Sequence, residues 1–331
     1  MQTRTPRLTF TAMLSALGLS ATLLASSVQA ATTWDMPTPY GDKTFHTENI
    51  REFAKEVAEA SAGELQITVH SNGSLIKHPE IKNAVRKGLV PIGELIMSRL
   101  ANEDALFEVD SVPFLATNYD EAWKLWQASK QALSTKLEAQ GLQLLFAVPW
   151  PPQGIYTKFP VNQIEDLAGV KMRAYNESSE TLAVLLGSVP TQVEVPDIPT
   201  AFSTGRVDAM ITSPSTGVNS KAWDFLSDFN HAQLWLPKNM VIVNAKAFKR
   251  LDADTQAKLL KAAETAEQRG WEMSRQETAK MLDELKANGI KVSEPNADLT
   301  SDLKKVGAQM EQNWLENAGA EGQAVLDAYR Q

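Results

Sequence analysis

Apolar positions alternate between helical and strand spacing along the chain. Ile50, Phe53 and Val57 recur at helical spacing before Gly63, whereas every second residue is apolar over 65–69, as in a half-buried strand. Further helices are expected over residues 80–87, 120–140, 178–186 and 198–204, and further strands over 89–97, 142–148, 170–175, 191–195, 207–212 and 240–243. Such alternation predicts an α/β fold with a mostly parallel sheet.

Two longer features suggest how these elements are grouped. Residues 252–287 keep a helical period without a break, which predicts one long amphipathic helix with a solvated polar face. The segment 80–90 resembles 197–207 at an offset of 117 residues, and the two strands that follow end at Ser98 and Ser213. One interpretation is a pair of similar lobes whose strand ends face each other across a cleft. The other is a helix–glycine–strand unit that is common in α/β proteins.

The first thirty residues have the features of an export signal. Arg4 and Arg7 precede an uncharged, apolar run over 8–25, and Val28-Gln29-Ala30 supplies a small–x–small cleavage pattern. The alternative is a membrane anchor, but the run is rich in Ser, Thr, Gly and Ala and ends at the cleavage pattern. We therefore expect a signal peptide over residues 1–30, cleavage near Ala30 and a periplasmic protein.

Composition and motifs exclude several classes of function. Lys and Arg total 32 against 40 Asp and Glu, a net charge of -8, which disfavours a nucleic-acid partner. The chain has no cysteine, and its four histidines lack metal-ligand spacing. S-x-x-K occurs at Ser74 and Ser301 without its companion motifs, and no G-x-S-x-G, H-E-x-x-H or G-x-G-x-x-G run occurs. We expect a protein that is not an enzyme and that has no cofactor and no metal site.

Five segments carry a resemblance to a known family. They are Asp110–Leu115, Ile164–Arg173, Leu186–Pro190, Asp197–Ala201 and Gly205–Asp208. In these segments the sequence resembles the DctP family, the solute-binding proteins of tripartite ATP-independent periplasmic (TRAP) transporters. The resemblance implies an α/β, two-lobed, type II-like periplasmic binding fold with the long helix spanning both lobes. Lobe I is expected over 31–153 plus about 243–280, and lobe II over 154–242 plus about 281–331.

The resemblance also implies a function and partners. It predicts a periplasmic receptor that captures a small organic carboxylate and delivers it to TRAP membrane permease subunits. Two alternatives remain open, a periplasmic binding protein with a sensory or scaffold partner and a periplasmic hydrolase. An apolar, aromatic or branched ligand body is a further expectation, based on Trp150.

Arg173 is the principal candidate for ligand binding. It lies at the end of an apolar strand, and its planar guanidinium matches a carboxylate in two parallel hydrogen bonds. The resemblance assigns it to the family arginine that pairs with the substrate carboxylate. The alternative is a structural ion pair with a nearby Asp or Glu.

The remaining candidates are aromatic or polar residues at strand ends and at the expected lobe junction. Trp150 lies between two prolines and is expected either to form a wall of the ligand site or to pack at the hinge. Thr212 or Ser213 stands where the family usually has an asparagine, and their hydroxyls can donate to a carboxylate. The other candidate positions at loop ends are Tyr175, Asn176, Ser74, Ser98 and Arg99.

Overall fold

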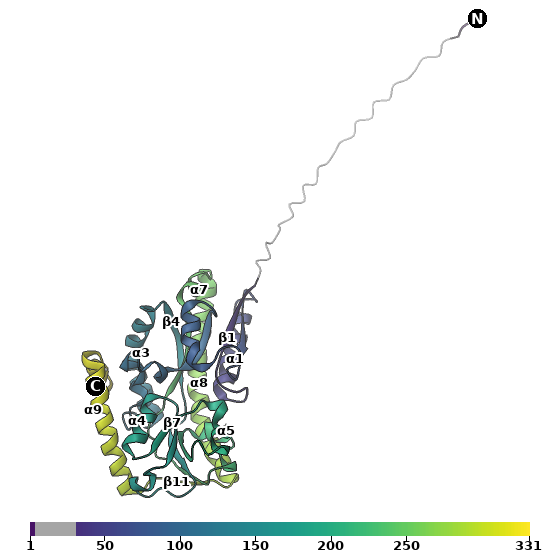
Figure 1. The fold of residues 1–331 in the computed structure, drawn as a ribbon. Helices are drawn as coiled ribbons and strands as arrows, with labels where there is room; N and C mark the ends of the chain where they lie inside the picture. Colours follow the sequence, from purple (N-terminus) through teal and green to yellow (C-terminus); the bar gives the residue numbers. More distant parts are fainter. Residues whose placement is uncertain (4–30) are drawn as a thin grey trace. The chain divides into compact units, whose positions relative to one another are not determined.

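The computed structural model describes residues 1–3 and 31–331, and residues 31–331 form one compact unit (Figure 1). Residues 4–30 of the expected signal peptide lie outside the described residues. The strands are β1 (Thr32–Pro37), β2 (Leu65–His70), β3 (Ile92–Ile96), β4 (Leu142–Pro149), β5 (Gly154–Thr157), β6 (Lys171–Ala174), β7 (Val189–Gln192), β8 (Ala209–Thr212), β9 (Asp228–Asn230), β10 (Lys238–Asn244) and β11 (Lys291–Ser293). The helices are α1 (Phe45–Ala60), α2 (Ile81–Lys87), α3 (Tyr119–Glu138), α4 (Glu177–Leu185), α5 (Ile198–Ser203), α6 (Pro214–Asn219), α7 (Ala245–Lys249), α8 (Ala253–Ala287) and α9 (Ala297–Arg330).

The first lobe is the part of the unit built on β1–β4 and β10. Strands β1 and β2 pair in parallel, and β10 lies between β3 and β4, antiparallel to both. All seven residues of β10 are buried, as expected for a central strand covered on both faces. Helix α1 packs on β2 and α8, and α3 packs on β4. Two apolar clusters fill this lobe on either side of the three-stranded sheet.

The second lobe is built on a six-stranded sheet of order β11-β9-β5-β8-β6-β7. Strands β6, β7 and β8 run parallel to one another, whereas β5 is antiparallel to both β8 and β9. Strand β11 is parallel to β9, so three of the five pairings in this sheet are parallel and only β5 runs against the other strands. The expectation of a mostly parallel sheet is therefore confirmed for the second lobe and wrong for the three-stranded sheet of the first lobe, where β10 runs against both neighbours. The reason is that β5 and β10 each enter a sheet from the other lobe, and an antiparallel neighbour needs no helical crossover.

Two extended segments cross between the lobes side by side. One follows β4 and the other precedes β10, and backbone bonds join them between Trp150 N and Pro237 O at 2.8 Å and between Gln153 N and Trp235 O at 2.9 Å. The expected lobe boundary near residue 242 falls within β10, which pairs with β3 and β4. We therefore propose that the second lobe ends before Lys238.

Helix α8 packs against both lobes, as the family resemblance implies. Leu259 and Ala266 lie in an apolar cluster of the first lobe, and Leu285 lies in a cluster of the second. Gly270 lies where α8 crosses β4, and a Cβ there would come within 2.4 Å of a methyl carbon of Val148. Only glycine allows this close approach.

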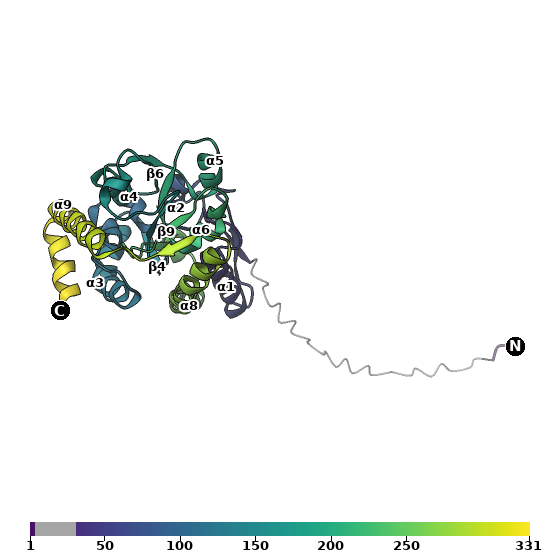
Figure 2. The ribbon, with the colours of Figure 1, turned by 90° about the horizontal axis from the view of Figure 1, so that it is seen from below.

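Helix α9 was not expected and also contacts both lobes. Leu299 and Leu303 pack in the second lobe, and Trp314 and Leu326 pack in the first. Gly319 interrupts the helix with φ 59° and ψ −143°, and the two segments on either side of it diverge in Figure 2. Among the described residues, none of the helices is apolar over a length that would cross a membrane.

Candidate functional site

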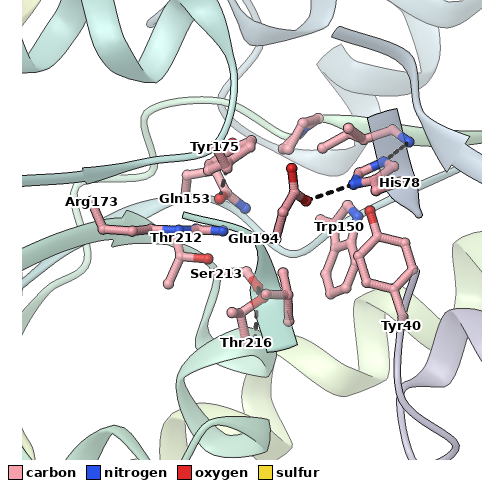
Figure 3. A pocket seen from close by; sticks show the side chains of 13 residues that line it. Tyr40, His78, Trp150, Gln153, Arg173, Tyr175, Glu194, Thr212, Ser213 and Thr216 are labelled. Carbon is pink, nitrogen blue, oxygen red and sulfur yellow. Dashed lines mark hydrogen bonds and ion pairs between the residues drawn. The ribbon is translucent and has the colours of Figure 1, made fainter. Parts of the chain in front are cut away.

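A small cavity lies between the two lobes, beside the crossing segments. The space between its walls is about 380 Å³, part of which is open to solvent. Its lining residues come from both lobes and from the crossing segments (Figure 3): Tyr40, His78, Ile96, Trp150, Gln153, Arg173, Tyr175, Glu194, Val195, Thr212, Ser213, Thr216 and Pro237. The cavity therefore includes five of the nine residues that the sequence singled out, namely Trp150, Arg173, Tyr175, Thr212 and Ser213.

Arg173 extends into this cavity from β6 and is 1% exposed. Its Nε donates to the carbonyl of Val193 at 2.9 Å, and the guanidinium carbon lies 5.0 Å from the centre of the Tyr175 ring. Within residues 31–331, neither Nη group has a hydrogen bond or an ion pair, and Figure 3 shows the guanidinium directed toward the centre of the cavity. Burial lowers the pKa of Arg173 to about 10, so the group remains charged at neutral pH.

This arrangement disagrees with a structural ion pair for Arg173. A buried charge without a partner is costly, and a carboxylate that accepts two parallel hydrogen bonds would remove that cost. The backbone bond at Nε fixes the plane of the guanidinium and leaves the two Nη groups for such a contact. The geometry therefore supports an anionic ligand at this position.

Trp150 and Tyr40 form an aromatic wall opposite Arg173 in Figure 3. Their ring centres are 4.9 Å apart at 65°, an edge-to-face contact. Both donate to Oδ1 of Asn239, the Tyr40 hydroxyl at 3.0 Å and the Trp150 indole at 2.9 Å. Trp150 thus lines the cavity and also packs where a segment crosses between the lobes, a position compatible with both expected roles.

A buried carboxylate lies behind this wall. Glu94 accepts from the Asn239 amide at 3.1 Å and from the Thr38 hydroxyl at 2.5 Å, and it lies 3.5 Å from Nδ1 of His46. Burial raises the pKa of Glu94 to about 7, although both hydrogen bonds act in the opposite direction. Because the Asn239 amide N–H donates to Glu94, the amide oxygen of Asn239 is directed toward Tyr40 and Trp150.

Tyr175 and Gln153 form another side of the cavity. The Tyr175 hydroxyl donates to Gln153 Oε1 at 3.2 Å and accepts from the Trp235 indole at 3.0 Å. The Gln153 amide donates to the carbonyl of Pro151 at 2.8 Å. These bonds fix the Tyr175 ring, over which the Arg173 guanidinium lies.

Glu194 follows β7 and carries the one carboxylate among the residues that line the cavity in the described structure. Its oxygens pair with His78 Nδ1 at 3.0 Å and with the Arg99 guanidinium, so this contact joins the two lobes. Burial alone would raise the pKa of Glu194, but the His78 hydrogen bond and the charges of Arg99 and Arg173 outweigh it and hold the pKa below its ordinary value.

Strand β8 brings Thr212 and Ser213 to the cavity. Both are buried, and Ser213 accepts from the backbone N–H of Thr216 at 3.1 Å as the N-cap of α6. None of the described residues hydrogen-bonds the Thr212 hydroxyl, which lines the cavity beside Arg173 in Figure 3. Thr212 is therefore free to donate to a ligand, whereas Ser213 is already used by the helix.

The other four predicted residues lie outside this cavity. Ser98, Arg99 and Asn176 line a neighbouring polar cavity that shares His78 with the first. Asn176 caps α4 and donates to Ser98 across the lobes at 2.8 Å. Ser74 is exposed and donates to the Ser71 carbonyl within its turn at 2.6 Å.

Five polar residues of the cavity were not predicted from the sequence, namely Tyr40, His78, Gln153, Glu194 and Thr216. Gln153 follows the Pro-rich break and could have been included with Trp150, since both lie in the same crossing segment. Thr216 lies in the first turn of α6, and the other three carry no recognisable motif. Among the described residues, no group of three or more His, Asp or Glu side chains is arranged to hold a metal ion.

Comparisons with known proteins agree with this geometry. Residues 38–317 match the family described as bacterial extracellular solute-binding protein, family 7 (DctP). The structure of DctP7 from Bordetella pertussis, an extracytoplasmic solute receptor binding pyroglutamic acid, is 48% identical, with a TM-score of 0.90 over 91% of this chain and 100% of that one. DctP6 from the same organism, described in the same words, is 44% identical, with a TM-score of 0.89 over 90% and 99% of the two chains.

A third structure is a TRAP solute-binding protein from a marine metagenome, described as specific for pyroglutamate and solved with the co-purified ligand. It is 40% identical to this chain, with a TM-score of 0.89 over 91% of this chain and 99% of that one. These matches cover both lobes of the fold. The chain therefore belongs to the DctP family of bacterial extracellular solute-binding proteins, whose members are periplasmic receptors for small organic acids and not enzymes.

Proposed function

We propose that this receptor binds pyroglutamate, the cyclic lactam of glutamate, and delivers it to a TRAP-type membrane permease. The observation that carries the proposal is the buried Arg173 guanidinium, whose Nη groups have no protein partner in residues 31–331 and face the cavity between the lobes. Three relatives that are 40–48% identical over 90% or more of the chain are described as binding pyroglutamate. The anionic ligand that Arg173 favours and the pyroglutamate that these relatives bind therefore agree.

In this account the ligand carboxylate accepts two hydrogen bonds from Arg173, and the Thr212 hydroxyl supplies a further donor nearby. The aromatic wall of Tyr40 and Trp150 covers an apolar face of the ring. An aromatic or branched acid, the expectation based on Trp150 alone, is the competing candidate. The relatives favour a compact saturated ring instead.

We also propose that the two lobes close over the ligand. His78 and Arg99 of the first lobe meet Glu194 of the second, and Ser98 meets Asn176. Hinge bending at the crossing segments would separate these pairs and open the cavity further to solvent. Export through the expected signal peptide would place the receptor where such a permease accepts its ligand, and a sensory partner remains the alternative.

The ligand can be identified directly. Protein purified without denaturation should release pyroglutamate that mass spectrometry detects, and added pyroglutamate should raise the melting temperature of ligand-free protein. At 100 times the dissociation constant, binding adds ~2.7 kcal/mol to the unfolding free energy. A panel should include an aromatic acid, a branched acid and a sugar acid. Stabilisation by one of these and not by pyroglutamate would contradict the proposal.

A further inference from the structure

We propose that Glu194 determines specificity by accepting a hydrogen bond from a ring N–H of the ligand. This inference rests on the proposed function and deepens it. It defines the ligand class as cyclic carboxylates with an N–H next to the carboxylate-bearing carbon. Keto acids and dicarboxylates of the same size, whose oxygens accept hydrogen bonds and do not donate them, fall outside that class.

The first step of the argument is the protonation state around Glu194. The backbone N–H of Ile96 donates to Nε2 of His78 at 3.3 Å. Because Nε2 accepts, the proton of the neutral imidazole lies on Nδ1, which donates to Glu194 at 3.0 Å. Burial lowers the pKa of His78, which agrees with the neutral ring. Glu194 is therefore ionised and acts as an acceptor only.

The second step is the number of hydrogen bonds that Glu194 can accept. A carboxylate has about four lone-pair sites, and within residues 31–331 the Glu194 oxygens are occupied by His78 and Arg99. At least one site on each oxygen is thus available. The side chain also lines the cavity (Figure 3) and is 35% exposed, so a bound ligand can reach it.

The third step is the match between the cavity and the ligand. The cavity presents a cationic end at Arg173 and an anionic acceptor at Glu194, with no ion pair between them in the described structure. Pyroglutamate carries its carboxylate on the carbon that is bonded to the ring N–H. Its carboxylate can therefore pair with Arg173 while its ring N–H donates to Glu194. A keto or carboxylate oxygen facing Glu194 would instead be repelled, and a methylene would leave the Glu194 carboxylate desolvated without a donor.

A different role for Glu194 must be separated from this one. Its contact with His78 and Arg99 joins the lobes, so it also contributes to closure. Loss of closure weakens every ligand by the same factor, whereas loss of an acceptor weakens only ligands that carry the N–H. The ratio of two affinities distinguishes the two roles.

The test uses pyroglutamate and its carbocyclic analogue 3-oxocyclopentane-1-carboxylate, in which a methylene replaces the ring N–H. Calorimetric titration measures both dissociation constants for wild-type protein, Glu194→Met and Arg99→Met. The Arg99 variant is the matched control, because it breaks the same ion pair and leaves Glu194 in place. Wild-type protein should bind pyroglutamate about 30-fold or more tightly than the analogue, as expected for a hydrogen bond to a charged group.

The preference should persist in Arg99→Met, with both ligands weakened alike, and should fall to within about threefold in Glu194→Met. Equal binding of both ligands by wild-type protein would overturn this inference and leave the proposed function intact. This measurement does not depend on the folding of any variant. An unchanged preference in Glu194→Met would also overturn it. Failure of wild-type protein to bind pyroglutamate would overturn the proposed function itself.

Discussion

Arg173 and Glu194 line the same cavity, yet they do not pair with each other in the described part of the chain. Glu194 is held by His78 and Arg99, whereas Arg173 is anchored by the carbonyl of Val193. The two charges are kept apart by these separate anchors. A ligand with an anion and a donor can therefore bind both groups without displacing either from its anchor.

The aromatic wall leads to the first prediction. Replacement of Asn239 by Leu removes the acceptor that Tyr40 and Trp150 share and leaves Glu94 without one donor. We expect the unfolding free energy to fall by about 1–3 kcal/mol, because buried polar groups lose their partner. Affinity for pyroglutamate should fall about tenfold as the wall loses its orientation. Denaturant unfolding and calorimetric titration measure the two effects.

Asn83→Leu is the matched control for this prediction, since Asn83 is exposed and lies outside the cavity. This variant should change neither the unfolding free energy nor the affinity for pyroglutamate. Unchanged stability in Asn239→Leu would show that the shared acceptor contributes nothing to the fold.

Glu94 predicts a pH dependence of stability. Burial raises its pKa from 4.5 to about 7, so between these values the folded state binds more protons than the unfolded state. Ionisation of the buried Glu94 carboxyl destabilises the folded state. This destabilisation is absent below pH 4.5, grows as the pH rises and is complete above pH 7. Its full size is on the order of 3 kcal/mol.

The measurement is the difference in unfolding free energy between Glu94→Gln and wild-type protein at several pH values. Because His46 lies 3.5 Å from Glu94 and burial lowers its pKa, the same difference is also measured in a His46→Gln background, which removes the contribution of the imidazole. The difference should shift in favour of the variant as the pH rises through this range. A difference that does not vary with pH would mean that Glu94 titrates as an ordinary exposed carboxyl.

Gly270 gives a prediction about packing. Alanine is the better helix former by ~1 kcal/mol, but a Cβ at this position would lie 2.4 Å from Val148 and 2.7 Å from the Asn49 amide. Overpacking typically costs about 1–3 kcal/mol, so Gly270→Ala should lower the melting temperature. Lys280→Ala, at an exposed position of the same helix, serves as the control. A stabilised Gly270→Ala protein would show that α8 can move away from β4.

Periodicity predicted much of the fold because the helices have clear apolar faces and ends. Helix α8 begins and ends within one residue of its expected limits, and Asp252 caps it by accepting from the backbone N–H of Thr255 at 2.9 Å. Helix α9 was missed although Leu299, Leu303 and Trp314 recur at helical spacing. The reversed direction of β5 and β10 could not be predicted, because it depends on where the chain crosses between the lobes.

Residues of the candidate site were predicted where the residue type and its place at a strand end already suggested a ligand contact. Arg173 could be found because a cation at the end of an apolar strand needs an anion. Tyr40, His78 and Glu194 lie far apart in the sequence and meet only because the lobes face each other. No local pattern distinguishes them from other residues in loops.

The central claim is that Arg173 binds the carboxylate of the ligand. Calorimetric titration of pyroglutamate should show that Arg173→Ala weakens binding by about 2–5 kcal/mol, as truncation of one side of a buried charge pair does. Arg173→Lys should restore only part of this, because an ammonium lacks the planar fork. Arg206→Ala, which alters an exposed arginine of the same lobe, should bind as the wild type does. Wild-type affinity in an Arg173→Ala protein whose circular dichroism shows a native fold would contradict the account.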